Sequence, residues 1–266
     1  MSIVLSDCEY NRLQNLIRIS IGVVVKNRIL LQSDLQQILL HGKFNSFTEY
    51  LNYLESNWTQ QNLEELVSHV VVNHTYFYRE SAHFEYFQNE ILPSIKDKRD
   101  IRIWCAGCST GQEAYTLAMI LMEFFGDQYS KHCAGVLATD ISTNVILEAV
   151  GGVYTEEEGM MLPDELYKKY FVDYDERQMQ IIDDVKRKVT FRIFNLVGEM
   201  YPFKKAFAVI FCRNVLMYFD PIVQKHVISK FYECTQNGGY LILGHIDPFN
   251  CLQYQKISPS VFKKQD

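Results

Sequence analysis

Two glycines, Gly107 and Gly111, follow a short apolar run that begins at Ile101 and precede a segment, residues 114–125, whose apolar side chains recur at helical spacing. This order predicts a strand, a tight loop and a helix. Glycine adopts positive φ and lets a ligand approach the backbone, and the helix turns its free N–H groups toward the loop. Such a corner suits a nucleotide-like or carboxylate-bearing ligand. The G-x-x-x-G spacing differs from the dinucleotide fingerprint, so a plain strand-to-helix turn is an equal alternative.

Asp140 ends a second apolar run, residues 135–140, about one strand-helix-strand unit after the glycine loop. In nucleotide-binding α/β sheets, an acidic residue at the end of the second strand accepts hydrogen bonds from ribose hydroxyls. The alternative is that Asp140 is a helix N-cap, although Ser142 is equally suited to that position. We therefore interpret Asp140 first as a ribose ligand.

Cys105 and Cys108 form a C-x-x-C pair inside the glycine loop, which raises a redox or zinc alternative. The sequence offers neither a second pair nor neighbouring histidines to complete a tetrahedral zinc site. Seven cysteines, an odd number without regular spacing, fit free thiols in a reducing compartment better than a disulfide framework. We expect two small, half-buried residues and no metal.

The elements that position these residues fall into two parts. Residues 7–72 contain four groups of apolar side chains at i, i+3, i+4 spacing, which predicts a small domain of about four helices. Ser33, Ser46 and Asn62 are the expected N-caps, and Gly42 marks a helix end. No residue pattern in this part suggests catalysis.

The remainder alternates between strand and helix patterns. Residues 84–95 read as a helix broken at Pro93, and the apolar run at residues 208–212 reads as a central parallel strand buried on both faces. Asp220 is the expected N-cap of a later helix, with a proline next to it, and residues 237–239 are its expected end. Residues 240–243 are the next predicted strand, and residues 251–262 suit a reversed hairpin.

Composition limits the classes of function. The chain has 266 residues, enough for one large domain or a medium domain with a smaller companion, and ordinary globular hydrophobic and charged fractions. A net charge of −6 with scattered basic residues argues against nucleic-acid binding. The start lacks the pattern of a signal peptide, and the longest apolar stretch, residues 16–25, is too short to span a membrane. We expect a cytoplasmic protein without membrane insertion.

Six blocks in order resemble the chemotaxis receptor methyltransferases of the CheR family. The likeness runs from about residue 73 to the end, with a thinner likeness before it. The blocks are NHTYFYRE at 73–80, WCAGCSTGQEAY at 104–115, ATDIS at 138–142, FNL at 194–196, FCRNVLMYF at 211–219 and, more weakly, GGY at 238–240 through GH at 244–245.

The resemblance implies a Rossmann-like α/β fold, with a mostly parallel sheet and helices on both faces. It implies an N-terminal all-α domain at 1–72 and an S-adenosylmethionine-dependent methyltransferase domain at 73–266. A small antiparallel β-subdomain is expected as an insertion at about 152–190, where residues 166–171 read as a short helix and residues 179–182 and 188–191 as strands. The implied activity is methyl-ester formation on protein glutamate side chains, with a chemoreceptor as substrate.

The resemblance also assigns roles to residues. Glu113 is expected to bind the ammonium group of the cofactor, Asn195 and Leu196 to contact its adenine end, and Tyr218 to line the methyl-transfer site. The implied catalytic residues are Arg79, Arg213 and Tyr218. The implied cofactor-binding residues are Asn73, Thr75, Arg79, Gly107, Gly111, Glu113, Asp140, Asn195, Leu196, Arg213 and Asn214.

The chain departs from the family in three places. Residues 29–42 contain neither Arg nor Lys, whereas the matching helix of related enzymes is arginine-rich and is thought to face the chemoreceptor. Residues 172–179 contain no glycine, unlike members that tether a receptor pentapeptide, so we expect no tether. The usual Gly-His-Ser-Glu reads Gly-His-Ile-Asp at 244–247, and we interpret His245 as structural. Two alternatives follow: a cofactor-binding regulatory or scaffold protein, or a methyltransferase with a non-chemoreceptor substrate.

Overall fold

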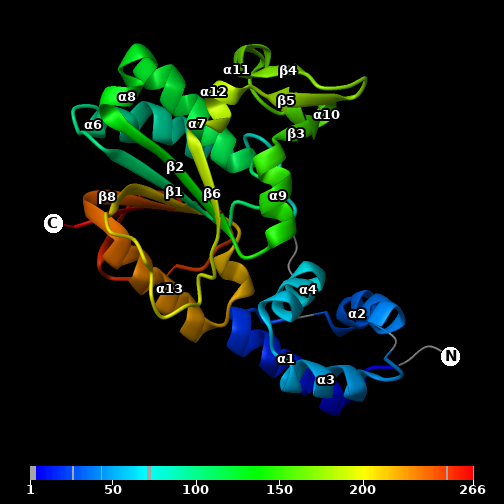
Figure 1. Ribbon diagram of the computed structural model, residues 1–266. Coiled ribbons are helices and arrows are strands. Elements are labelled where there is room, and N and C mark those ends of the chain that lie inside the picture. Colours follow the sequence, from blue (N-terminus) through cyan, green and yellow to red (C-terminus); the bar gives the residue numbers. More distant parts are fainter. Residues whose placement is uncertain (1–3, 26, 43, 71–72, 250, 266) are drawn as a thin grey trace.

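The computed structural model describes residues 4–25, 27–42, 44–70, 73–249 and 251–265. Its N-terminal part contains four helices, α1 (Asp7–Ile21), α2 (Arg28–Gly42), α3 (Phe47–Ser56) and α4 (Gln60–Val70), as the apolar spacing predicted. They gather around a core of their own that includes Leu13, Ile17, Leu35, Tyr50 and Leu66. Figure 1 shows this bundle, drawn in blue and cyan, beside one end of the α/β part. The expected domain boundary after residue 72 lies outside the described residues.

The caps of these helices differ in part from the prediction. Ser46 is the N-cap of α3, and its side chain accepts a hydrogen bond from the Glu49 N–H at 3.1 Å, as expected. Ser33 and Asn62 lie inside α2 and α4, so both were wrong as caps. The Asn27 side chain accepts from the Leu30 N–H instead, and Thr59 Oγ1 accepts from the Asn62 N–H. Both helices begin earlier because polar residues upstream of the apolar pattern satisfy their free N–H groups.

Seven strands form the main sheet, in the order β6-β2-β1-β7-β8-β10-β9. The first five strands in this order run parallel, while β10 is antiparallel to β8 and β9 is antiparallel to β10. The α/β fold class and the C-terminal hairpin are therefore confirmed. The strands are β1 (Ile101–Ala106), β2 (Cys133–Asp140), β6 (Val189–Ile193), β7 (Phe207–Cys212), β8 (Thr235–Leu243), β9 (Tyr254–Ser258) and β10 (Val261–Lys264).

Alternating side chains of the central strands supply the cores on the two faces of the sheet. Ile103 and Cys105 point to one face, where α7 (Gln112–Phe125) and α9 (Thr143–Gly151) pack. Trp104 and Ala106 point to the other, where α13 (Pro221–Cys234) packs. Every residue of β7 is buried, as a central parallel strand covered on both sides requires. Helices cover both faces in Figure 1.

The helix expected at residues 84–95 is not broken at Pro93. It runs through α5 (Ala82–Tyr86), a π-helical turn (Phe87–Ile91) and α6 (Leu92–Ile95). Pro93 lacks an N–H and lies in the first turn of α6. The wider π-helical turn before it accommodates the proline without ending the helix. Three short helical segments, η2 (Gly126–Gln128), α8 (Tyr129–His132) and η3 (Leu216–Tyr218), connect the other elements.

A second, three-stranded antiparallel sheet lies between α9 and β6, in the order β3-β5-β4. Its strands are β3 (Val153–Thr155), β5 (Gln178–Ile181) and β4 (Phe171–Asp173), and α10 (Glu156–Gly159), α11 (Asp164–Tyr170) and α12 (Asp183–Lys186) adjoin it. The small antiparallel sheet implied by the resemblance is thus present. The strand predicted at 188–191 belongs to the main sheet, as β6 beside β2.

The end of α13 differs from the prediction. Asp220 caps the start of this helix as expected, accepting from the N–H groups of Ile222 and Val223. The helix ends at Cys234, however, and residues 237–239 lie within β8. The register of β8 with β7 shifts there, and Gly238 has φ of +65°. The two glycines therefore allow an irregular stretch within strand β8 and do not mark the end of a helix. In the described part of the chain, no helix is long and apolar enough to cross a membrane.

Candidate cofactor-binding site

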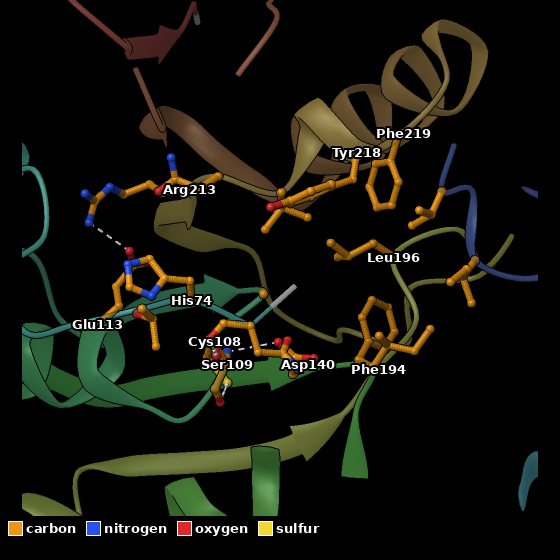
Figure 2. A pocket seen from close by; sticks show the side chains of 18 of the residues that line it. His74, Cys108, Ser109, Glu113, Asp140, Phe194, Leu196, Arg213, Tyr218 and Phe219 are labelled. Carbon is orange, nitrogen blue, oxygen red and sulfur yellow. Dashed lines mark hydrogen bonds and ion pairs between the residues drawn. The ribbon is translucent and has the colours of Figure 1, made fainter. Parts of the chain in front are cut away.

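A pocket lies at the carboxyl ends of β1, β2 and β7. The space without atoms in it measures about 960 Å³, including the part that is open to solvent. The chain runs outward from β1 through β2 to β6, then returns to place β7 on the other side of β1. Ligands of open α/β sheets bind at such a reversal of strand order. Figure 2 shows the side chains that line the pocket.

Gly107 lies directly after β1, with φ of +82°, and lines the pocket. A Cβ atom at this position would lie 2.4 Å from Val215 Cγ2, so only glycine fits between the loop after β1 and the loop after β7. Gly111, by contrast, is not among the lining residues. Its φ of +96° and the 2.9 Å that would separate its hypothetical Cβ from Ala149 both require glycine, so the residue serves the turn and the close approach of α9.

Asp140 lies at the end of β2, with its carboxylate at the pocket wall. Oδ2 accepts the Ser109 N–H at 2.9 Å, and Oδ1 accepts the Ser142 N–H at 3.0 Å. Burial raises the pKa of Asp140 above its ordinary value, and these backbone N–H groups oppose that effect. The side chain fixes the loops after β1 and β2 together, while each oxygen keeps a lone pair for another donor. The N-cap alternative was wrong, because Ser142 is the N-cap of α9, whereas the position of the carboxylate at the pocket is compatible with a ribose ligand.

Glu113, in the first turn of α7, forms an ion pair across the pocket with Arg213, which follows β7. Its Oε2 lies 2.8 Å from Arg213 Nη1, and Cys105 Sγ donates to its Oε1 at 3.2 Å. Arg213 also pairs with Glu80, at 3.2 Å between Nη2 and Oε2, and donates to the Arg79 carbonyl oxygen. The Arg213 side chain is almost fully buried, so two carboxylates neutralise a guanidinium that burial alone would disfavour.

The loop after β7 is held in a strained shape. Asn214 has φ of +58°, a left-handed conformation that costs free energy in a residue with a side chain. Asp247 holds this loop: its Oδ2 accepts the Asn214 N–H at 2.5 Å, and its Oδ1 accepts the Met217 N–H at 3.1 Å. Burial raises the pKa of Asp247, against the effect of these backbone bonds. Beyond the departure from the family motif at this position, no sequence pattern indicated this role of Asp247.

Arg79 lines the pocket, and its guanidinium also contacts a nearby backbone carbonyl. Its Nη1 donates to the His74 carbonyl oxygen at 2.7 Å, and its guanidinium lies 5.8 Å from the centre of the Tyr76 ring. Among the described residues, Arg79 forms no ion pair. The two pocket arginines therefore differ, because Arg213 is neutralised by Glu80 and Glu113 whereas Arg79 is not.

The N-terminal bundle closes one side of the pocket. Ile21 and Val23, at the end of α1, and Val70, at the end of α4, are among its lining residues. Val24 N–H donates to the Tyr218 carbonyl oxygen at 2.8 Å. Asn195 Nδ2 donates to the Ser20 carbonyl oxygen at 2.9 Å, so this amide joins the bundle to the loop after β6. Nothing in the sequence pattern had indicated that the bundle contributes to the site.

The structure brings together every predicted site residue except Gly111. The predicted residues that line the pocket are Asn73, Thr75, Arg79, Gly107, Glu113, Asp140, Asn195, Leu196, Arg213, Asn214 and Tyr218. Lining residues that were not predicted are Ile21, Val23, Val70, His74, Cys108, Ser109, Ile141, Phe194, Val215 and Phe219. Most of the lining residues that were not predicted are apolar or contribute backbone atoms. Several are direct sequence neighbours of predicted residues, and this adjacency is the signal from which they could have been predicted.

Cys105 and Cys108 are free thiols and fully buried, not half-buried as expected. Burial raises the pKa of both thiols well above its ordinary value, so both are protonated at neutral pH. A protonated thiol is neither a good nucleophile nor a metal ligand. Within the described chain, no grouping of metal-ligating side chains includes either cysteine.

Comparisons with known proteins agree with this geometry. Residues 73–261 match the family model described as CheR methyltransferase, SAM binding domain. The chain is 37% identical to a chemotaxis protein methyltransferase of Borreliella burgdorferi, over 99% of this chain and 96% of the relative. It is 32% identical to chemotaxis protein methyltransferase 2 of Vibrio cholerae (91% and 86%), and 30% identical to the chemotaxis protein methyltransferase of Escherichia coli K12 (94% and 88%). The chain belongs to the CheR methyltransferase family.

The family fixes the cofactor as S-adenosylmethionine and the function as S-adenosylmethionine-dependent methylation in chemotaxis, which confirms the expectation from the sequence at this level. The pocket fits such a molecule. It offers a carboxylate at Asp140, apolar walls at Ile141, Phe194 and Leu196, and a close backbone approach at Gly107. The scaffold alternative is not favoured.

Proposed function

We propose that this CheR family member methylates glutamate side chains of a protein, forming methyl esters. One observation carries the proposal: Arg79 lies at the pocket without an ion pair among the described residues, while Arg213 is already neutralised by two carboxylates. A cation at the open part of a methyl-transfer pocket favours an anionic acceptor, because it forms charge-assisted hydrogen bonds with a carboxylate. A lysine or other cationic acceptor would be repelled.

The chemistry requires little from acid–base groups. S-adenosylmethionine would supply a methyl group on a positively charged sulfur: the carboxylate oxygen would bond to the methyl carbon as the carbon–sulfur bond breaks, and S-adenosylhomocysteine would leave as a neutral thioether. A glutamate carboxylate has a reference pKa of about 4.3 and is ionised at neutral pH, so no proton must be removed. The pocket therefore has to align the reactants at near-attack distance and exclude water. In this scheme Arg79 orients the carboxylate, and Arg213, Asn214 and Tyr218 form the wall around the reacting atoms.

The remaining predicted residues are assigned to the cofactor. Asp140 binds the ribose hydroxyls with its free lone pairs, and Asn195 and Leu196 lie at the adenine end. Glu113 accepts from the ammonium group while it stays paired with Arg213, since a carboxylate has about four acceptor positions and Glu113 uses two of them here. Asn73, Thr75 and Gly107 complete the wall near the sulfur. Gly111 takes no direct part in this assignment and allows the close approach of α9 instead.

The substrate we propose is a chemoreceptor, because the relatives that cover most of this chain are chemotaxis protein methyltransferases. The bundle domain, residues 1–72, and the inserted subdomain at about 152–190 are the proposed partner-contacting parts. The second helix lacks the arginines of the family and exposes Ile29, Leu30 and Leu40. A receptor with a less acidic methylation region would suit this helix, and an atypical protein substrate is the alternative.

Incubation with methyl-labelled cofactor and receptor cytoplasmic domains tests the proposal. We expect labelled protein that releases labelled methanol in alkali, because methyl esters are base-labile. Label that resists alkali would indicate N-methylation, and absence of transfer to any receptor domain would favour the atypical substrate.

Arg79→Ala tests the acceptor assignment. Loss of one charge-assisted contact of about 1.5–3 kcal/mol should lower kcat/KM for the receptor about 10- to 100-fold. The affinity for S-adenosylhomocysteine, measured by calorimetry, should fall less. Arg99→Ala is the matched control, since Arg99 is an exposed arginine in the turn before β1, outside the pocket and both proposed partner-contacting parts. Wild-type kcat/KM in Arg79→Ala would contradict the assignment.

A further inference from the structure

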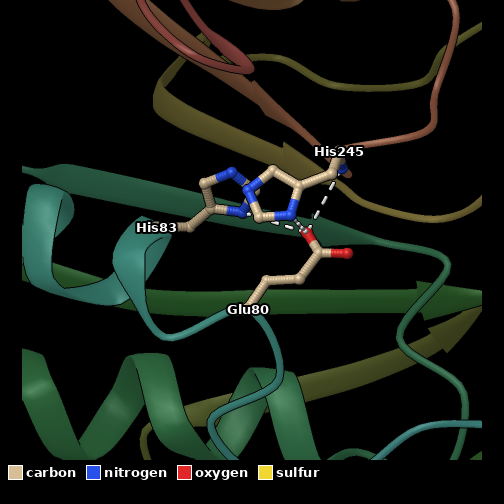
Figure 3. Close-up of side chains that lie close together, drawn as sticks. All are labelled: Glu80, His83 and His245. Atoms are coloured by element: carbon tan, nitrogen blue, oxygen red, sulfur yellow. Dashed lines mark hydrogen bonds and ion pairs between the residues drawn. The ribbon is translucent and has the colours of Figure 1, made fainter.

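Three potential metal ligands meet beside Arg213, outside the lining of the cofactor pocket. They are Glu80 and His83, at the start of α5, and His245, in the loop after β8 (Figure 3). Glu80 Oε2 lies 3.3 Å from His83 Nδ1 and 3.7 Å from His245 Nδ1. The two imidazole rings lie 4.7 Å apart between their centres, tilted by 54°. The three ligand atoms all lie within 4.8 Å of one another.

His83 is buried without a hydrogen-bond partner. It is 2% exposed, and neither ring nitrogen has a partner among the described residues. The 3.3 Å approach of Nδ1 to Glu80 is close enough for an ion pair but lacks the geometry of a hydrogen bond. Burial, followed by the charge of Arg213, lowers the pKa of His83 to about 4, so the ring is neutral at neutral pH. A buried polar group without a partner requires an explanation, and a bound ion is one of few.

The cluster is wider than a formed transition-metal site, with its ligand atoms within 4.8 Å of one another, and the half-exposed His245 ring would have to turn inward to close it. Bonds of about 2.0–2.1 Å in tetrahedral geometry place neighbouring ligand atoms about 3.3 Å apart, close to the two separations from Glu80. Two imidazoles and one carboxylate are the ligands that zinc and its neighbours use in open sites, whereas Mg²⁺ and Ca²⁺ prefer oxygen ligands alone. The His245 side chain is 51% exposed, which provides an entry path and room for water as a fourth ligand.

We propose that Glu80, His83 and His245 form a binding site for one divalent transition-metal ion, with Zn²⁺ as the representative ion. Three donors already contact Glu80 and compete with a metal: Arg213 Nη2 lies 3.2 Å from Oε2, the His245 N–H donates to Oε2 at 3.3 Å, and Asn214 Nδ2 donates to Oε1 at 3.1 Å. Glu113 pairs with the same guanidinium at 2.8 Å, so the charge of Arg213 stays neutralised when Glu80 turns toward a metal. The metal site therefore shares Glu80 with the ion pairs of Arg213, a residue that lines the cofactor pocket.

Titration of metal-free protein with Zn²⁺ and Co²⁺ tests the proposal. Calorimetry should give one Zn²⁺ site per chain with micromolar or tighter affinity. The Co²⁺ form should show visible d–d absorption without a thiolate-to-cobalt charge-transfer band, which separates this site from one made by the free cysteines. Histidine side-chain NMR should show two imidazoles shifted at one equivalent of Zn²⁺.

His245→Ala is the informative variant, because its half-exposed ring can be removed without opening the core. Zn²⁺ affinity should fall at least about tenfold, as loss of a direct ligand exceeds the effect of losing an outer-shell partner. His132→Ala is the matched control: this histidine lies in α8 and outside the cluster, and its removal should leave binding unchanged. No Zn²⁺ binding by the wild-type protein, a thiolate band, or unchanged affinity in His245→Ala would each overturn the proposal.

Discussion

Asp140 performs two tasks that are usually separate. Its two oxygens accept the backbone N–H groups of Ser109 and Ser142, which fixes the loops after β1 and β2, and the same carboxylate faces the pocket. A carboxylate has about four acceptor positions, so the two backbone bonds leave room for two ribose hydroxyls. The structural role and the binding role are therefore compatible in one side chain.

Asp140→Ala should weaken binding of S-adenosylhomocysteine by about 1–3 kcal/mol, because two hydroxyl groups lose their charged acceptor. Isothermal titration calorimetry with the purified protein measures this without any need to know the substrate. Asp100→Ala is the control, since that aspartate lies just before β1 and pairs with Lys205 at the surface. Unchanged affinity in Asp140→Ala would remove this residue from the cofactor site.

At the scale of elements, the turn between β4 and β5 bears on partner choice. The Tyr174 N–H donates to the Gln178 carbonyl oxygen at 2.9 Å, and the Arg177 N–H donates to Asp175 Oδ1 at 2.9 Å, so the connection closes on itself without a glycine. Charged side chains beside this turn also discourage the addition of another strand at the edge of the small sheet.

We expect no saturable binding of a pentapeptide from a chemoreceptor C-terminal tail, because strand addition needs an accessible backbone edge next to a compliant loop. Calorimetry or fluorescence polarisation with the labelled peptide checks this. A scrambled peptide of the same composition is the control for weak non-specific association. Saturable binding of the tail peptide alone would show that glycine is dispensable in this loop.

Helix α3 offers a clean measurement of a predicted cap. Ser46→Ala should lower the free energy of unfolding by about 0.5–2 kcal/mol, because the Glu49 N–H loses its acceptor. Ser33→Ala is the matched control: Ser33 is exposed inside α2, where alanine has the higher helix propensity, so the change should be neutral or slightly stabilising. Urea unfolding of both variants distinguishes them, and equal effects would contradict the observed helix starts.

At the scale of the whole molecule, Gly22 joins the bundle to the α/β part. It ends α1 with φ of +72°, and its carbonyl oxygen accepts the Asp220 N–H at 3.2 Å. A Cβ atom there would lie 2.7 Å from Val223 Cγ1 and 2.8 Å from Val197 Cγ2. Because Ile21 and Val23 line the pocket on either side of this glycine, the junction determines how the pocket is closed.

Gly22→Ala should lower the free energy of unfolding by about 1–2 kcal/mol from the left-handed backbone alone. It should also weaken S-adenosylhomocysteine binding, because the close contacts push the bundle away from the pocket. Gly151→Ala is the control, since no atom lies within 4 Å of its hypothetical Cβ and its φ is not positive. Urea unfolding and calorimetry measure both effects. Wild-type affinity in a destabilised Gly22→Ala would show that the bundle does not shape the cofactor site.

The sequence by itself determined the fold class, the helical character of residues 7–70 and the succession of strand, loop and helix around Gly107. The helices and the strand, loop and helix follow from local periodicity, whereas the fold class and most site residues follow from the resemblance of the motifs to the CheR family. Parallel strands deliver the motif residues at their ends to one edge of the sheet. The expected site residues therefore converge on one pocket, apart from Gly111.

Only the tertiary structure decided what those residues contact. Gly111 serves the packing of α9 instead of the pocket, Glu113 is already paired with Arg213, and Asp247 holds the loop of Asn214. The bundle closes the pocket through Ile21 and Val23, and Glu80, which is close to His83 in sequence, meets His245 from the far end of the chain. Most of these contacts join segments that are tens to hundreds of residues apart in the sequence. The local pattern of apolar and polar residues carries no information about how close such segments lie in space.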